Sequence, residues 1–162
     1  MKNKPAGKAD PGAYAGLRNL AFSSSRAEWG LPTPASSADI WAVVMDTTCT
    51  DGRSYTVVAI EDGNASIYLS SGGGFIGGVS HEAVSAAAKI LVRTAGQYLA
   101  QMRKVHSFPL PAPGDTTFYV RTDSGIYSVT APEEDLGEGR NRFSPLFYAA
   151  QDVITEYRLI NP

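Results

Sequence analysis

The sequence predicts an α+β fold: a two-layer sandwich whose long helices pack on one face of a five-stranded, mainly antiparallel sheet. Three observations support this prediction. Short apolar or alternating segments are separated by tight-turn residues, a pattern typical of antiparallel hairpins. Two longer segments place apolar residues three and four positions apart, as amphipathic helices do. Each such helix needs an apolar partner, and one face of a sheet supplies it.

The N-terminal part is expected to hold a tail and a first helix. Residues 1–9 show no apolar periodicity, so we expect a flexible tail before a single α+β domain of residues 10–162. Asp10 and Pro11 predict the helix start, because Asp caps a first turn well and proline needs no amide donor there. The glycine and prolines of residues 30–34 predict its end.

Three strands joined by two turns are expected next. Residues 40–45 are apolar without interruption, which indicates a strand with both faces covered. Residues 55–60 and 65–70 each follow an Asp-Gly pair, and the second of these segments alternates between apolar and polar side chains. Two short turns between three strands predict an antiparallel meander.

A long helix is expected after these strands. Ser80 is the predicted N-cap, and Lys104 lies near the predicted C-terminal end, where a cation is favoured. The charged face with Lys89 and Arg93 is interpreted as a solvated surface. The apolar stripe at helical spacing consists of Val84, Ala88, Leu91, Ala95, Leu99 and Met102.

The C-terminal part of the chain is expected to form a hairpin, a loop and a final helix. Residues 117–122 and 126–130 read as strands on either side of a turn, and residues 132–142 read as a polar loop. Ser144 and Pro145 repeat the pattern of a cap followed by proline, with an amphipathic segment after them. The predicted element order is therefore α-β-β-β-α-β-β-α.

The composition excludes several classes of protein. A chain of 162 residues with 43% hydrophobic and 19% charged residues is typical of a globular domain rather than of a disordered chain. A net charge of −2 gives no support for a nucleic-acid partner, which would require many Lys and Arg. No apolar run is long enough to cross a membrane, so no membrane partner is expected.

Cys49 is the only cysteine, and this also limits the possibilities. It excludes an intramolecular disulfide and a four-cysteine zinc site, and it favours a reducing compartment, which we take to be the cytoplasm. No nucleophile motif surrounds Cys49, so we interpret it as a small, half-buried residue. No metal or cofactor motif is recognisable, and none is expected.

A glycine-rich segment, residues 72–78, is the first candidate site. Gly72, Gly74 and Gly77 match the pattern G-x-G-x-x-G between a strand and a helix. Glycines let backbone amides approach an anion, and the amides at a helix start point toward it. A dinucleotide site fits poorly, because the preceding strands read as antiparallel and the next strand is distant. The candidate ligand-binding residues are Gly72, Gly73, Gly74, Gly77, Gly78 and Ser80.

Three interpretations of this segment are open. The first is a site for a small anionic ligand, the second is a tight crossover between strand and helix, and the third is a close backbone approach to a neighbouring subunit. His81 follows Ser80 and is the candidate catalytic residue, since a helix N-terminus favours a neutral imidazole that can act as a base. The alternative is that His81 is an exposed residue of the first turn.

Three tyrosines are expected on a sheet face that the helices leave open: Tyr55, Tyr68 and Tyr119. Tyrosine suits a partner surface, because it buries a large area at low entropy cost and keeps a polar tip. These residues therefore predict a homodimer or another protein-binding face.

Two functional hypotheses follow. The first is a small non-enzymatic binding module that self-associates, since no metal motif, catalytic triad or interpretable carboxylate pair is recognisable. The second is an anion-binding protein or enzyme that uses residues 72–78 and the helix start at Ser80.

Overall fold

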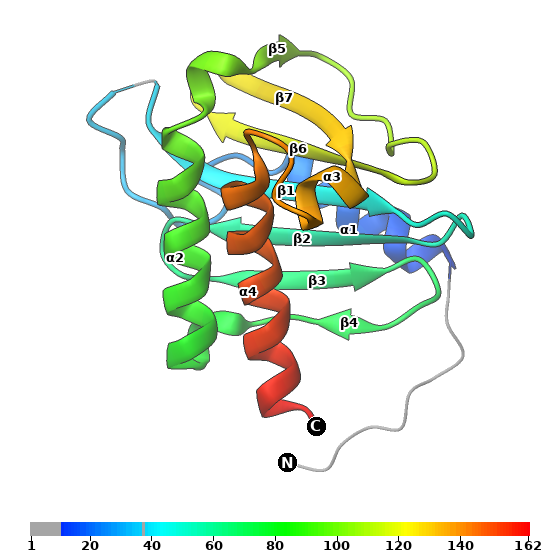
Figure 1. Ribbon diagram of the computed structural model, residues 1–162. Coiled ribbons are helices and arrows are strands. Elements are labelled where there is room, and N and C mark those ends of the chain that lie inside the picture. Colours follow the sequence, from blue (N-terminus) through cyan, green and yellow to red (C-terminus); the bar gives the residue numbers. More distant parts are fainter. Residues whose placement is uncertain (1–10, 37) are drawn as a thin grey trace.

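The computed structural model describes residues 11–36 and 38–162, which form four α-helices and seven strands (Figure 1). The predicted tail, residues 1–9, and the cap at Asp10 lie outside the described residues. The helices are α1 (Pro11–Ser23), α2 (Glu82–Gly96), α3 (Glu133–Gly137) and α4 (Ser144–Ile160). The strands are β1 (Ile40–Thr48), β2 (Ser54–Ile60), β3 (Ala65–Leu69), β4 (Gly74–Phe75), β5 (Arg103–Val105), β6 (Asp115–Thr122) and β7 (Gly125–Pro132).

All seven strands belong to one sheet, in the order β4-β3-β2-β1-β6-β7-β5. Every neighbouring pair is antiparallel, so the predicted α+β class and antiparallel sheet are confirmed. β1 lies in the middle, and its side chains alternate between two cores: Val43 and Met45 point to one, Ala42 and Val44 to the other. Both faces of β1 are therefore covered, as its continuous apolar run indicates.

Helices α2 and α4 pack side by side on one face of the sheet (Figure 1). The core beneath them is fully buried at Val84 and Leu91 of α2, Leu146 of α4 and Phe118 of β6. Burial of such side chains is the main source of stability for both helices, because amphipathic helices of this length are marginal alone.

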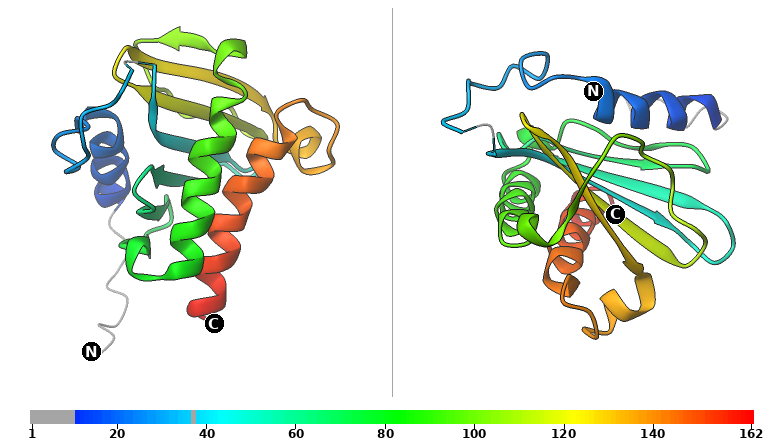
Figure 2. Two further views of the ribbon diagram at one scale, coloured as in Figure 1. Left: turned by 90° about the vertical axis from the view of Figure 1, so that its left-hand side faces the viewer. Right: turned by 90° about the horizontal axis from the view of Figure 1, so that it is seen from above.

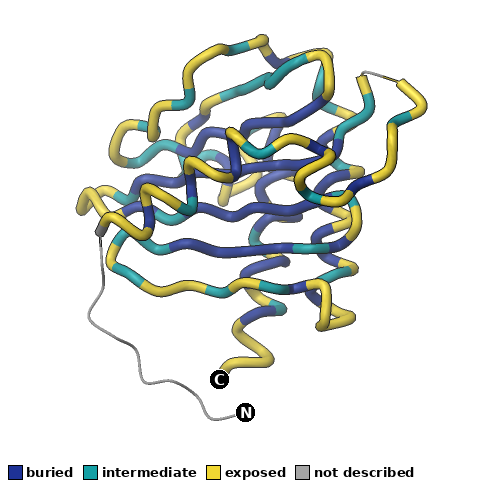
Figure 3. The backbone as a smooth tube through the Cα atoms, turned by 180° about the vertical axis from the view of Figure 1, so that it is seen from behind, coloured by how far each residue is buried: buried dark blue, intermediate teal, exposed yellow. Residues whose placement is uncertain are grey.

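Helix α1 covers the opposite face, as the view from above shows (Figure 2). Tyr14 and Phe22 of α1 pack over Trp41 and Tyr119 of the sheet, and the strands beneath α1 are largely buried (Figure 3). The Phe108 ring, in the connector before β6, stacks on Phe22 with ring centroids 4.6 Å apart. The predicted two-layer sandwich is therefore wrong: α1 adds a third layer.

A buried ion pair joins α1 to the centre of the sheet. Arg18 Nη2 donates to Asp46 Oδ2 at 2.6 Å, and Arg18 Nε donates to the same oxygen at 3.0 Å. Asp46 is completely buried, and Thr56 Oγ1 donates to its other oxygen at 2.6 Å. The Tyr14 hydroxyl lies 2.8 Å from Thr56 Oγ1 and completes the network. These contacts satisfy a charge that would otherwise be costly to bury.

The predicted count of five strands is wrong, and so is the predicted element order. Two short edge strands, β4 and β5, extend the sheet to seven, and the predicted loop of residues 132–142 contains α3. Helix α2 ends at Gly96, so Leu99 and Met102 lie beyond it; both nevertheless pack against the core. None of the described helices has the length and apolarity that a membrane-crossing helix requires.

Candidate functional site

The first half of the glycine-rich segment forms a hairpin turn between β3 and β4. The Gly72 amide donates to the Leu69 carbonyl at 2.9 Å, and the Leu69 amide donates to the Gly73 carbonyl at 3.2 Å. Gly72 and Gly73 have φ of +101° and +79°, a region that favours glycine and closes hairpins of this kind. Gly74, at φ +146°, pairs with Tyr68 in the edge strand.

The second half of the segment leads into α2 through one 3₁₀ turn. Gly78 is buried here, and a Cβ at this position would lie 2.6 Å from both Tyr157 Oη and Val84 Cγ1. The prediction that Ser80 is the N-cap is wrong, because α2 begins at Glu82 with His81 at the N-cap, and the Ser80 hydroxyl donates to the Gly77 carbonyl at 3.0 Å. Gly72, Gly73, Gly74 and Gly78 thus have structural roles that require no ligand.

His81 occupies the N-cap position of α2 and is exposed. Its backbone amide donates to the Gly78 carbonyl at 3.0 Å, while its ring makes no hydrogen bond within residues 11–36 and 38–162. A general base must lie within hydrogen-bond reach of the proton that it removes, so a catalytic role of His81 stays a prediction.

Gly74→Ala is expected to lower the free energy of unfolding by about 1–3 kcal/mol. A Cβ at Gly74 would lie 2.0 Å from the Ile67 carbonyl oxygen, and φ of +146° is strained for alanine. Chemical denaturation measures this loss.

Gly16→Ala is the matched control. A Cβ at Gly16, within α1, meets nothing within 4 Å, so alanine should stabilise the helix by about 0.5–1 kcal/mol. Equal stability of Gly74→Ala and the wild type would contradict the structural role of Gly74.

The three tyrosines expected on an open sheet face do not lie together. Tyr68 and Tyr119 are buried beneath α1, with 6% and 2% of their surface exposed. Tyr55 is half-buried on the other face, where Gln151 of α4 donates to its hydroxyl at 3.0 Å. The open face that the prediction required is absent, because α1 covers it.

The Cys49 thiol is half-exposed just after β1. Burial, followed by the carboxylates of Glu133 and Asp51, raises the pKa of this thiol. A nucleophilic cysteine needs a lowered pKa, so these surroundings do not activate Cys49.

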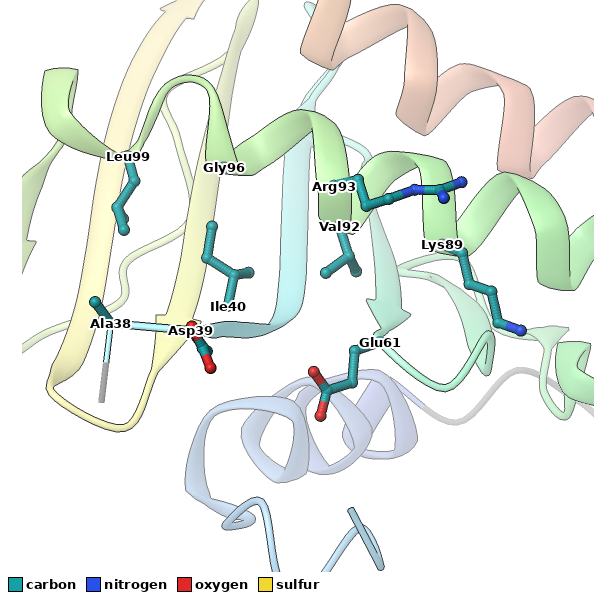
Figure 4. Close-up of a pocket in the computed structure, with 9 residues that line it drawn as sticks. All are labelled: Ala38, Asp39, Ile40, Glu61, Lys89, Val92, Arg93, Gly96 and Leu99. Atoms are coloured by element: carbon teal, nitrogen blue, oxygen red, sulfur yellow. The ribbon is translucent and has the colours of Figure 1, made fainter. Parts of the chain in front are cut away.

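The outer face of α2 carries the most distinctive exposed surface. Val79, just before α2, and Ile90 expose 54% and 47% of their surface, and Ala86 lies with them in a hollow of about 510 Å³. A second hollow, of about 560 Å³, lies between α2 and the strand ends (Figure 4). Lys89 and Arg93 line both hollows, and this whole surface is called the α2 face below.

The charges of the α2 face are unpaired. Glu82, Lys89 and Arg93 are exposed, and none of them forms an ion pair within the part of the chain that the structure describes. The Glu61 and Asp39 side chains lie across the second hollow (Figure 4). Arg26 holds the Glu61 carboxylate, and the Asp39 carboxylate accepts from the Ser36 amide. The face therefore combines exposed apolar side chains with free charges, two of which, Lys89 and Arg93, line both of its hollows.

Sequence reasoning missed this face, because Lys89 and Arg93 were interpreted as a solvated surface. The available signal was Ile90, which interrupts an otherwise polar and small-residue side of α2. Among the described residues, no three His, Cys, Asp or Glu side chains gather as metal ligands would. The chemistry that the α2 face offers is apolar contact and ion pairing.

No protein-family model, curated protein or solved structure matches this chain. The candidate site is therefore defined by its geometry alone. That geometry is a helix face with two hollows that share Lys89 and Arg93, with exposed apolar side chains at Ala86 and Ile90 and charges of both signs beside them.

Proposed function

We propose that this protein is a non-enzymatic interaction module that self-associates through the α2 face. The observation that carries the proposal is the exposure of Val79 and Ile90 in one hollow, beside the small side chain of Ala86. An apolar centre with a charged rim is the usual anatomy of a protein interface. Small side chains also let a second helix approach closely.

Charge complementarity favours a second copy of the chain as the partner. Glu82 lies in the first turn of α2 and Arg93 in the last. A two-fold axis midway between Ala87 and Ala88 would pair two α2 helices antiparallel, with Glu82 of one protomer opposite Arg93 of its partner. Symmetry repeats this ion pair at the other end, as a self-complementary interface requires. On this axis Ile90 of each protomer lies opposite Ser85 of its partner and Ala86 lies opposite Lys89, so that Ile90 and the Ala86 of the partner are diagonal neighbours.

The proposed compartment is the cytoplasm. Cys49 is the only cysteine in the sequence, and its thiol is free and half-exposed. A free accessible thiol is compatible with a reducing compartment.

Ile90→Glu tests the proposal by placing a charge at the apolar centre of the α2 face. We expect the wild type to sediment as a concentration-dependent dimer, and the variant to weaken self-association by about thirtyfold or more. Ile90 is exposed in the protomer, so the fold should be retained. Sedimentation velocity over a range of micromolar concentrations measures the effect.

Leu20→Glu is the matched control, because Leu20 is 56% exposed on α1, on the opposite side of the sheet. It should leave self-association unchanged. A wild type that stays monomeric, or equal effects of the two variants, would contradict the proposal.

A further inference from the structure

A separate hollow of about 470 Å³ lies on the α1 side of the sheet, where the segment after α1 passes the ends of β1 and β6. Ala27, Leu31, Pro34 and Trp41 form its apolar lining. Its volume falls within the range of small-molecule sites. This hollow shares no lining residue with the α2 face, although the ion pair between Arg26 and Glu61 connects it with the second hollow of that face.

Arg121 lines this hollow and is only 9% exposed. Its Nη1 group donates to the carbonyls of Ala21 and Ser24, at 2.8 and 2.6 Å, where α1 ends. Its Nε is buried without an acceptor, and Nη2 makes no hydrogen bond within the described residues. The guanidinium lies over the Trp41 ring, with Cζ 4.2 Å from the ring centroid.

The unbonded donors of Arg121 share one edge of the guanidinium. Nε–H and Nη2–H point in parallel directions, the geometry that holds a carboxylate or phosphate with two hydrogen bonds. The hydrogen bonds from Nη1 to the carbonyls at the end of α1 explain why Arg121 is buried. These hydrogen bonds do not use the edge that carries Nε–H and Nη2–H.

The two arginines that line the hollow, Arg26 and Arg121, differ in their acidic partners. Arg26 is neutralised by the carboxylates of Glu61 and Asp123. Arg121 forms no ion pair among the described residues, and burial lowers its pKa to about 10, so it stays charged at neutral pH. Glu28, the acidic side chain that acts on Arg121 from a distance, is exposed and accepts from the Ser25 amide.

We propose that this hollow binds a small organic monocarboxylate. Its carboxylate group accepts hydrogen bonds from Nε and Nη2 of Arg121, and its apolar body contacts Leu31 and Pro34. One negative charge matches Arg121, which, unlike the other arginine that lines the hollow, forms no ion pair among the described residues. A phosphate dianion fits less well, because it would place a second negative charge near Asp123 and Glu61.

Nuclear magnetic resonance of the indole N–H groups tests this proposal. The chain has only two tryptophans, Trp29 and Trp41, so the assignment is simple. Sodium butyrate is titrated against the full chain, with sodium chloride and sodium phosphate at matched ionic strength. We expect a saturable shift of the Trp41 signal with butyrate and no saturable shift with chloride.

Three variants test whether the shift of the Trp41 signal arises from butyrate bound in the hollow. Ala27 is exposed and lines the hollow, so Ala27→Phe should fill it and abolish the shift without disturbing Arg121. Ala100→Phe, at an exposed position remote from the hollow, should leave the shift unchanged. Arg121→Lys keeps the charge but loses the paired donors, and should weaken binding by about tenfold.

Three results would overturn the proposal. They are a butyrate response that does not saturate, a response that persists in Ala27→Phe, and a stronger response to phosphate than to butyrate. Variants of the α2 face should leave the butyrate response unchanged, so the two proposals fail separately.

Discussion

Arg18→Met is expected to lower the free energy of unfolding by about 3–5 kcal/mol. The substitution leaves Asp46 completely buried in the centre of the sheet without its cation. Thr56 still donates to one carboxylate oxygen, but one neutral hydrogen bond does not replace a charged pair. Methionine keeps most of the aliphatic volume beneath α1, so the loss reports mainly on the charge. Urea denaturation at neutral pH measures it.

The double variant Arg18→Met/Asp46→Leu separates the charge from the packing. Removing both charges should recover most of the stability, because buried ion pairs are often replaceable by apolar residues of similar volume. If the free energy of unfolding of the single variant Arg18→Met lay within about 1 kcal/mol of the wild-type value, the pair would contribute no more than a surface ion pair does. That result would contradict the burial of the pair.

Leu91→Ala and Ile90→Ala are expected to differ strongly, although the residues are neighbours on α2. Leu91 is completely buried against the sheet, so its truncation should cost about 2–5 kcal/mol of unfolding free energy. Ile90 is 47% exposed, so its truncation should change stability by no more than about 0.5–1 kcal/mol. Denaturation at concentrations where the protein is monomeric measures both.

The same pair of variants distinguishes the two sides of α2. Self-association should weaken in Ile90→Ala and persist in Leu91→Ala wherever the fold survives. If Ile90→Ala destabilised the monomer as much as Leu91→Ala, the α2 face would belong to the core of the protomer.

The helices and central strands could be predicted from the sequence, because their patterns are local. Helical spacing identified α2 through Val84, Leu91 and Ala95, and all three are completely buried. The predicted helix was too long because Leu99 and Met102 continue the apolar stripe. Their burial comes from packing after the helix has ended, which periodicity alone does not reveal.

The edge strands could not be predicted, since β4 has only two residues and β5 has three. Each exists through its neighbour: Gly74 pairs with Tyr68, and Lys104 pairs with Tyr127. Such pairing is set by tertiary structure and leaves little local signal.

One feature of the sequence indicated a third layer and conflicted with the predicted two-layer fold. Residues 40–45 are apolar on both faces of β1, so two covering layers are needed, and α1 supplies the second. The same omission misplaced Tyr68 and Tyr119 on an open surface. Arg121 gave no local signal, because its site depends on the contacts of β6 with the end of α1.

The measurement that tests self-association through the α2 face most directly is sedimentation velocity of three charge variants. Glu82→Arg and Arg93→Glu should each weaken the dimer, because each places like charges opposite one another. The double variant should restore it, although both substitutions oppose the α2 dipole and so lower the stability of the monomer. A double variant that associates no better than the single variants would contradict the proposed interface.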